Sequence, residues 1–267
     1  MTDEPQKPLK ISIGVVHGDK IDAWFFHSIM GLLTSHHSQF DFVDHVCVRS
    51  GPLLAQGRGQ LVGSFLQNTT SDALLMIDSD QYATPDVIYS HADVFRRTRE
   101  QHPDVGIVAG LTYIAATPQD ADVLYPNIWM HGHHPLQMSQ MTTHPKDQLI
   151  EVAAMGCSNM MIAREVLQQF ADQNVNPFHH KSIVDYQLLV DGIATLDDRV
   201  KRAEVAQRTV EEADQFGEDL SFCYRVRQNG WKITCHTGII YEHSKSILLN
   251  EKMHDASVAR HTTKEPV

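Results

Sequence analysis

One run of apolar residues that ends in two carboxylates constrains the fold of this chain more than any other stretch. Residues 73–80 read ALLMIDSD, and the apolar part has no polar side that could face solvent. That pattern is typical of a strand covered on both faces in an α/β sheet. Asp78 and Asp80 follow at the carboxyl end of this strand, where open α/β sheets bind their ligands. The stretch therefore predicts a sheet with a polar site at its edge.

The two carboxylates are spaced so that one cation could contact both. Residues two apart in an extended segment point the same way. Carboxylate oxygens suit Mg²⁺ or Mn²⁺, which keep waters and take further ligands from substrate phosphates. A simpler interpretation is that Asp78-Ser79-Asp80 is a polar turn that closes the strand and caps the next helix. The tripeptide alone leaves both interpretations open.

The first half of the chain alternates between strand and helix patterns. Strands are expected at residues 10–16, 42–48 and 105–110, and helices at residues 22–35, 55–68 and 84–100. Asp22 is placed to cap the first helix, and Thr84 with Pro85 to begin the third. Such alternation indicates a parallel sheet with right-handed crossovers, so this half is expected to be Rossmann-like. The loop after the first strand lacks Gly-x-Gly-x-x-Gly, which weakens a dinucleotide-binding interpretation.

The middle of the chain is expected to be less regular. Residues 111–146 contain several prolines and the histidines at 131, 133, 134 and 144, and they are predicted to form a long loop. The Gly-His-Gly-His-His spacing matches no closed tetrahedral zinc site, so solvent-facing histidines are preferred. Residues 150–170 then predict a strand, a turn at Gly156, a second strand and a short helix. Residues 196–215 predict a solvated surface helix.

A second informative stretch, GEDLSFCYRVRQNG, covers residues 217–230. Glu218 and Asp219 open a predicted helix, and Gly230 ends it. Acids in a first turn are stabilised by the helix dipole, so ordinary first-turn charge also explains them. Residues 231–241 predict two short strands, which place Glu242 and His243 at their end.

Length and composition exclude several classes of protein. A chain of 267 residues can bury a full core, and no linker interrupts it, so we expect one domain over residues 1–250 and a polar tail over 251–267. The formal charge of −11 argues against holding nucleic acid by phosphate neutralisation alone, although a local basic groove remains open. The four cysteines form no Cys-x-x-Cys pair, and no apolar run reaches about 18 residues. We therefore expect a soluble, cytoplasmic protein.

Several segments occur together in an order that a known family shares. They are LLMIDSD, then AAMGCSNMMIAREVL, then GEDLSFCYRVRQNGWKITC, then His243. This order resembles the nucleotide-sugar glycosyltransferases of the GT-A fold, particularly small stand-alone enzymes similar to family 2 from bacteria and phages. The resemblance covers roughly residues 10–244 and implies an α/β, GT-A (Rossmann-like) single domain with a central, mostly parallel sheet. The Gln-x-x-Arg-Trp signature of processive synthases is missing, which speaks against a polymerising enzyme.

The resemblance implies a divalent metal site. In GT-A enzymes the second Asp of the Asp-x-Asp motif binds the cation that bridges the diphosphate, and this is Asp80 here. The first Asp, here Asp78, contacts the ribose or a metal-bound water. A histidine after the last core strands, here His243, completes the metal shell. The implied metal set is Asp78, Asp80 and His243, and the implied cofactor is Mn²⁺ or Mg²⁺.

The resemblance also implies roles in catalysis and acceptor binding. In inverting members one acid of the Glu-Asp pair is the general base, which points to Asp219, with Glu218 beside it. Gly156 and Cys157 lie where such enzymes place a loop on the acceptor side. The residues implied to bind the nucleotide are Val16, His17, Gly18, Arg58, Asp78 and Ser79.

The implied activity is inverting transfer of a hexose from a nucleotide sugar, with a UDP-sugar favoured, to an acceptor hydroxyl. A saccharide, a protein side chain and a hydroxylated base in phage DNA all remain open as acceptors. A host cytoplasm is expected if the protein is phage-encoded. Two other functions remain open: a sugar-phosphate nucleotidyltransferase, against which the lack of a Gly-rich phosphate loop speaks, and a non-catalytic binding module on the same fold.

Overall fold

The apolar strand predicted from residues 73–77 lies inside the central sheet. β3 (Ala73–Asp78) pairs in parallel with β1 (Leu9–His17) and antiparallel with β12 (Asn159–Ala163). The five residues from Ala73 to Ile77 have no exposed surface, and Asp78 is the first residue of the strand to reach solvent. The predicted strand and its polar end are therefore confirmed.

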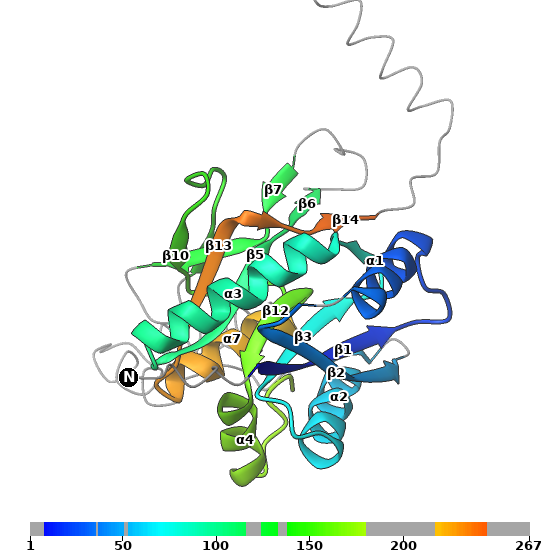
Figure 1. The fold of residues 1–267 in the computed structure, drawn as a ribbon. Coiled ribbons are helices and arrows are strands. Elements are labelled where there is room, and N and C mark those ends of the chain that lie inside the picture. Colours follow the sequence, from blue (N-terminus) through cyan, green and yellow to red (C-terminus); the bar gives the residue numbers. More distant parts are fainter. Residues whose placement is uncertain are drawn as a thin grey trace, which may run out of the picture.

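The computed structural model describes residues 8–35, 37–50, 53–115, 124–132, 138–179 and 217–244. Seven strands form the main sheet in the order β10-β13-β5-β12-β3-β1-β2 (Figure 1). The four strands not yet bounded are β2 (Phe40–Arg49), β5 (Val105–Leu111), β10 (Leu149–Glu151) and β13 (Lys232–Ile240). β12 and β10 run against the other five strands. The prediction of an α/β fold with a mostly parallel central sheet is confirmed.

Helices cover both faces of this sheet. α1 (Ala23–Thr34) and α3 (Pro85–Gln101) lie on one face, whereas α2 (Leu54–Asn68), α4 (Arg164–Asp172) and α7 (Glu218–Gln228) lie on the other (Figure 1). The Asp22 carboxylate accepts a hydrogen bond from the backbone N–H of Trp24 at 2.8 Å, and Thr84 caps α3. Gly230 adopts a φ of 86°, the left-handed conformation that ends α7. The predicted starts and the predicted end are confirmed.

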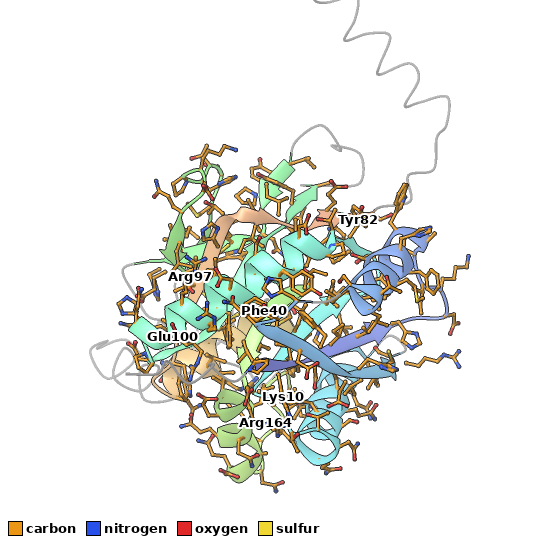
Figure 2. All side chains as sticks on the ribbon, in the orientation of Figure 1. Lys10, Phe40, Tyr82, Arg97, Glu100 and Arg164 are labelled. Carbon is orange, nitrogen blue, oxygen red and sulfur yellow. The ribbon has the colours of Figure 1, made fainter. Side chains whose placement is uncertain are left out.

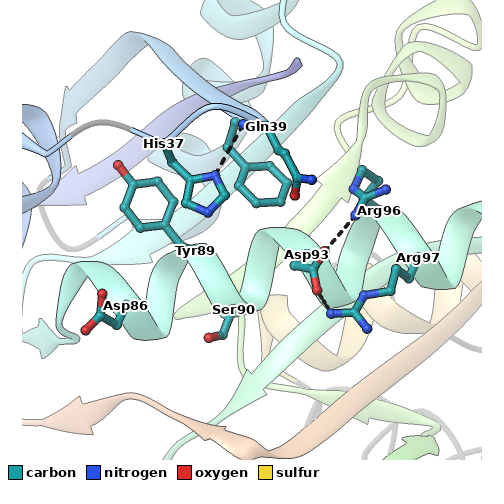
Figure 3. A pocket seen from close by; sticks show the side chains of 9 residues that line it. His37, Gln39, Asp86, Tyr89, Ser90, Asp93, Arg96 and Arg97 are labelled. Atoms are coloured by element: carbon teal, nitrogen blue, oxygen red, sulfur yellow. Dashed lines mark hydrogen bonds and ion pairs between the residues drawn. The ribbon is translucent and has the colours of Figure 1, made fainter. Parts of the chain in front are cut away.

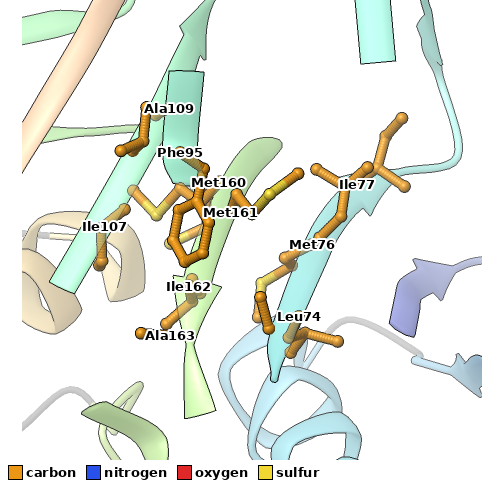
Figure 4. Packing of buried hydrophobic residues seen from close by; sticks show 14 of the residues in the cluster. Leu74, Met76, Ile77, Phe95, Ile107, Ala109, Met160, Met161, Ile162 and Ala163 are labelled. Carbon is orange, nitrogen blue, oxygen red and sulfur yellow. The ribbon is translucent and has the colours of Figure 1, made fainter. Parts of the chain in front are cut away.

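The core of the sheet is built from β3, β12 and β5 (Figure 4). Met160, Met161 and Ile162 of β12 lie between Met76 of β3 and Ile107 of β5, and Phe95 of α3 packs on them. All of these side chains are at most 2 % exposed. Each such side chain contributes about 1.5–3 kcal/mol by leaving water, so the strand that carries the acids has a rigid support.

The loop predicted over residues 111–146 has more structure than expected. Its described parts contain the short strands β6 (Tyr113–Ala115), β7 (Leu124–Pro126), β8 (Ile128–His131) and β9 (Met138–Gln140). β6 pairs with β7, and β8 pairs with β9 and with β11 (Ala154–Met155). Strands of three or four residues are too short to show a period, so their partners rather than their own pattern define them.

The segment 231–241 forms one strand, where two were predicted. β13 continues through the Gly238 region because Thr237 bonds to Gln148, and the pairing of β13 with β5 shifts register between His236 and Ile240. The expected break is thus an irregularity inside a continuous strand. β14 (Glu242–His243) follows and pairs with β4 (Gln81–Tyr82).

Some predicted features lie outside the described residues. They are the helix at residues 196–215, the tail from residue 251, and His133 and His134. Within the described part of the chain, none of the helices has the length and apolar character needed to cross a membrane.

A buried histidine makes the stability of the fold depend on pH. The His91 Nε2–H donates to the carbonyl of Val108 at 3.0 Å, and the hydroxyl of Tyr241 donates to Nδ1 at 2.9 Å. Burial lowers the pKa of His91 to about 4, whereas an unfolded histidine titrates near 6.5. Between these values the unfolded chain binds more protons. The free energy of unfolding should therefore fall by about 2 kcal/mol from pH 7 to pH 5.

Urea midpoints of wild type, His91→Gln and His102→Gln at pH 7 and pH 5 check this expectation. His102 is an exposed residue at the end of the same helix and serves as the control. His91→Gln should lose most of the pH dependence, and His102→Gln should keep it. Equal pH dependence in all three proteins would contradict the prediction.

Candidate active site

A buried arginine and three acids meet where β3 ends and α7 begins. The Arg58 side chain, from the first turns of α2, is only 2 % exposed. Its Nη2 lies 3.2 Å from both carboxylate oxygens of Asp78, and its Nη1 pairs with Asp219 and lies 3.7 Å from Glu218 Oε1. A buried guanidinium requires ionised partners. The Arg58 guanidinium therefore contacts acids from two distant parts of the chain.

Two glycines explain how Arg58 reaches this position. A Cβ on Gly57 would lie 2.5 Å from Cβ of Ser50, and one on Gly59 would lie 2.4 Å from Nδ2 of Asn176. Side chains at either position would push the first turns of α2 away from the segments after β2 and α4. The Gly-Arg-Gly sequence thus allows the close approach that buries Arg58.

The cluster perturbs the charge of its members. Burial raises the pKa of Asp78, and Asp219 and Asp80 raise it further, against the opposing effect of Arg58. Burial likewise raises the pKa of Asp219, against the effects of Arg58 and of hydrogen bonds from Cys157. Burial alone would lower the pKa of Arg58, but the surrounding acids more than offset it. Arg58 therefore stays charged, while both aspartates become stronger bases than usual.

Asp80 and His243 form a second pair beside this cluster. Pairing of β14 with β4 places His243 opposite Gln81, and His243 Nε2 lies 3.1 Å from Asp80 Oδ2. His243 Nδ1 lies 3.3 Å from the Tyr113 carbonyl. Because that carbonyl can only accept, Nδ1 carries a proton, and Nε2 of a neutral imidazole then presents a lone pair to a carboxylate oxygen. Either a second proton on His243 or a shared cation satisfies this arrangement.

The donor set of this pair fits a divalent cation. Two neighbouring ligands of an octahedral ion at about 2.1 Å lie about 3.0 Å apart, close to the observed separation. Within the residues that the structure describes, no group of three or more His, Cys, Asp or Glu side chains is arranged to hold a metal. Asp78 is turned toward Arg58. The protein thus offers two ligands, which suits an ion that takes its other ligands from phosphate and water.

The residues expected on the acceptor side lie against Asp219. Gly156 and Cys157 follow β11 and are buried, and the thiol and backbone of Cys157 lie close enough to the Asp219 carboxylate to lower its pKa. A Cβ on Gly156 would lie 2.0 Å from Nδ2 of Asn127, which itself is 8 % exposed. The loop that carries Cys157 is therefore tightly packed from β11 to Asn127.

The residues expected at the nucleotide lie around the ends of β1 and β3. Val16 pairs with Asp78 across the sheet, and the Ser79 carbonyl accepts a hydrogen bond from the Asp22 N–H at 3.1 Å. His17 is the last residue of β1 and is partly exposed, and Gly18 follows it and is exposed. Val16 and Ser79 are thus beside the acids, and His17 and Gly18 are at the rim.

The chain shares its fold with solved structures of low sequence identity. No protein-family model matches it, and no curated protein does. A197 from STIV aligns over 89 % of this chain and 86 % of its own, with 12 % identity and a TM-score of 0.50. GalNAc-T7 with UDP, GalNAc and Mn²⁺ aligns over 91 % of this chain with 9 % identity and a TM-score of 0.51. The chain corresponds to 45 % of the GalNAc-T7 chain.

A third structure, the CMP:2-keto-3-deoxy-manno-octonic acid synthetase complexed with CTP, aligns at a TM-score of 0.42 with 10 % identity, over 96 % of this chain and all of its own. The architecture shared with GalNAc-T7 confirms the predicted GT-A (Rossmann-like) fold class. At these identities the likeness concerns the fold alone.

Sequence reasoning missed a contact between Asp22 and Ser244 that ties the site together. The Ser244 hydroxyl donates to Asp22 Oδ2 at 2.8 Å, and the Ser244 N–H donates to the Asp80 carbonyl at 2.8 Å. Asp22 thereby caps α1 with one oxygen and holds the end of β14 with the other. Only the cap was visible in the sequence, because Ser244 is distant along the chain.

A hollow of about 660 Å³ lies elsewhere, between the edge strand β2 and α3 (Figure 3). The rings of His37 and Tyr89 lie 4.7 Å apart there, and Arg96 and Arg97 both pair with Asp93. The hollow shares no residue with the acid cluster, so the two are separate features.

The packing of Gly156 generates a test of the acceptor-side loop. Gly156→Ala should displace Asn127 and lower stability by about 1–3 kcal/mol. Gly63→Ala is the matched control, because a Cβ at that helical position meets nothing within 4 Å; it should raise stability by roughly 0.5–1 kcal/mol. Chemical denaturation of both variants measures the difference. A neutral Gly156→Ala would show that the loop has room that the structure does not reveal.

Proposed function

We propose that this protein is a metal-dependent, inverting glycosyltransferase that moves a sugar from a nucleotide sugar to an acceptor hydroxyl. The observation that supports it most is the meeting of Asp80 and His243 at 3.1 Å beside the Arg58 cluster that contains Asp219. A cation site and a base next to one another are what transfer from a nucleoside diphosphate requires. The GalNAc-T7 structure, which contains UDP and Mn²⁺, makes a UDP-sugar the first donor to test.

On the donor side, Asp80 and His243 would hold Mn²⁺ or Mg²⁺. When bound, the cation would offset the negative charge that develops on the departing diphosphate. Val16, His17, Gly18 and Ser79 would contact the nucleotide, and Asp78 would contact its ribose. Asp78 and Asp80 thus serve different parts of the donor.

On the acceptor side, Asp219 would take the proton of the attacking hydroxyl. Its carboxylate is held by Arg58 and Cys157 and is still 30 % exposed, so one side remains open to an acceptor. Burial raises its pKa, which strengthens it as a base. Asp219 connects to the donor side through Arg58 and Asp78. Attack from the side opposite the leaving group would give inversion at the anomeric carbon.

Product analysis would identify the acceptor and would distinguish the glycosyltransferase from the alternative activity, a sugar-phosphate nucleotidyltransferase. A saccharide, a protein side chain and a hydroxylated base in phage DNA are the acceptors to compare. Binding of DNA would show a strong salt dependence. Release of pyrophosphate from a nucleoside triphosphate would instead identify a sugar-phosphate nucleotidyltransferase.

Nucleotide binding tests the donor side. Thermal unfolding of wild type with UDP, GDP, CDP or dTDP should show stabilisation by one diphosphate, only with Mn²⁺ or Mg²⁺. A ligand at about 100 times its Kd adds about 2.7 kcal/mol. Asp80→Ala should abolish this stabilisation, because it removes one of two protein ligands. Asp172→Asn, an exposed acid at the end of α4, should keep it.

No stabilisation of wild type by any diphosphate would refute the donor assignment. Stabilisation that persists when a metal chelator replaces Mn²⁺ or Mg²⁺, and that persists in Asp80→Ala, would refute only the metal assignment.

The base is tested separately. Asp219→Asn should bind the donor diphosphate as wild type does but transfer sugar about 10²–10⁴-fold more slowly, because the amide cannot accept the proton. Calorimetry with the diphosphate and turnover with the donor sugar measure the two effects. Turnover at the wild-type rate would remove Asp219 from the mechanism.

A further inference from the structure

The Arg58 side chain touches an acid on each side of the site, which an arginine that merely lines the nucleotide would not do. Its Nη2 faces Asp78 at the end of β3, and its Nη1 faces Asp219 at the start of α7. We propose that Arg58 is a positioning residue that sets the distance between the donor-side acid and the acceptor-side base. This inference rests on the proposed glycosyltransferase function.

The arrangement costs more than a structural ion pair requires. One buried guanidinium needs one carboxylate, yet Arg58 faces three, so the arrangement brings the like charges of Asp78, Glu218 and Asp219 close together. Asp78 and Asp219 are still 27 % and 30 % exposed. Each of these two carboxylates is therefore partly exposed to solvent while it pairs with Arg58 on its buried side.

The shape of the guanidinium explains how one residue can hold both acids. Its nitrogens lie in one rigid plane, and different nitrogens contact Asp78 and Asp219. The two carboxylates are therefore fixed relative to each other as well as to Arg58. A lysine would keep the charge but offer one nitrogen on a flexible stem, so it could not hold the same separation.

Asp219 is held from a second direction by the loop after β11. The thiol and backbone of Cys157 lie close enough to its carboxylate to lower the pKa of Asp219, and Cys157 is fully buried. Arg58 and Cys157 therefore both adjoin the Asp219 carboxylate. Removal of Arg58 should therefore leave Asp219 present but misdirected.

The chain provides a matched control in Arg164 (Figure 2). Arg164 donates to the carbonyls of Ser71 at 2.6 Å and Thr69 at 2.7 Å, and it lies 4.4 Å from the centre of the Phe65 ring. Among the contacts described for it there is no carboxylate. Arg164→Ala should therefore lower the melting temperature and leave kcat and KM unchanged.

The experiment compares Arg58→Lys, Arg58→Ala and Arg164→Ala in the full chain. Arg58→Lys should remain folded and lose about a hundredfold in kcat, the size of effect expected from a misplaced reacting group. Arg58→Ala should regain transfer when guanidinium chloride is added at about 20 mM, far below denaturing concentrations. Urea, which has a similar shape without the charge, should not restore transfer, and neither should sodium chloride.

Three outcomes decide the proposal. Wild-type kcat and KM in Arg58→Lys would overturn the proposal. It would also be overturned if Arg58→Ala lost activity only in proportion to its fall in melting temperature and if guanidinium and urea then had the same effect. Selective rescue by guanidinium would support it. If wild type transfers no sugar, the melting temperature of Arg58→Ala gives a separate readout. Selective stabilisation of Arg58→Ala by guanidinium would then support the conclusion that Arg58 fixes the two acids, although the proposed glycosyltransferase function would be wrong.

Discussion

A positive charge buried among acids is the constraint on which the arrangement of this site depends. Arginine does not release its proton in proteins, so the guanidinium of Arg58, almost without exposure, requires anions around it. Asp78 and Asp219 supply them from the end of β3 and the start of α7. The two interpretations of the Glu218-Asp219 pair are therefore compatible: the dipole of α7 favours acids in its first turn, and Arg58 gives them a partner. Three elements are tied together at one point.

The direction of β12 decides what faces this point. β12 runs against β3 and β5, so it begins at the edge where they end. The residues that lead into it, Gly156 to Ser158, consequently lie beside the acids, and the Ser158 carbonyl accepts a hydrogen bond from the Asp78 N–H at 3.2 Å. In an all-parallel sheet this loop would lie at the opposite edge. Because β12 is antiparallel to its two neighbours, the loop that precedes it lies at the site.

Local patterns predicted the parts of the fold that depend on neighbouring residues. The apolar run before Asp78, the cap at Asp22 and the helix opened by Glu218 were all visible in the sequence, because propensity, capping and periodicity act over a few residues. The pairing of β8 with β11 and the continuity of β13 were not visible, because they depend on partners far along the chain. The burial of Arg58 belongs to this second group. Its flanking glycines were the only local signal.

The excess of negative charge in the site connects the Asp80–His243 pair with Arg58. Asp78, Glu218 and Asp219 place three carboxylates around the one guanidinium of Arg58, and Asp80 adds a fourth negative charge near Asp78. A free diphosphate would be repelled by this excess of negative charge. Burial is the main cause of the raised pKa values of Asp78 and Asp219, and the neighbouring acids add to it. A diphosphate whose charge is already partly neutralised by a divalent cation would meet less repulsion and would find Asp80 and His243 as ligands. On the proposed function, the acidic character of the site would favour binding of the diphosphate together with a cation over binding of the diphosphate alone.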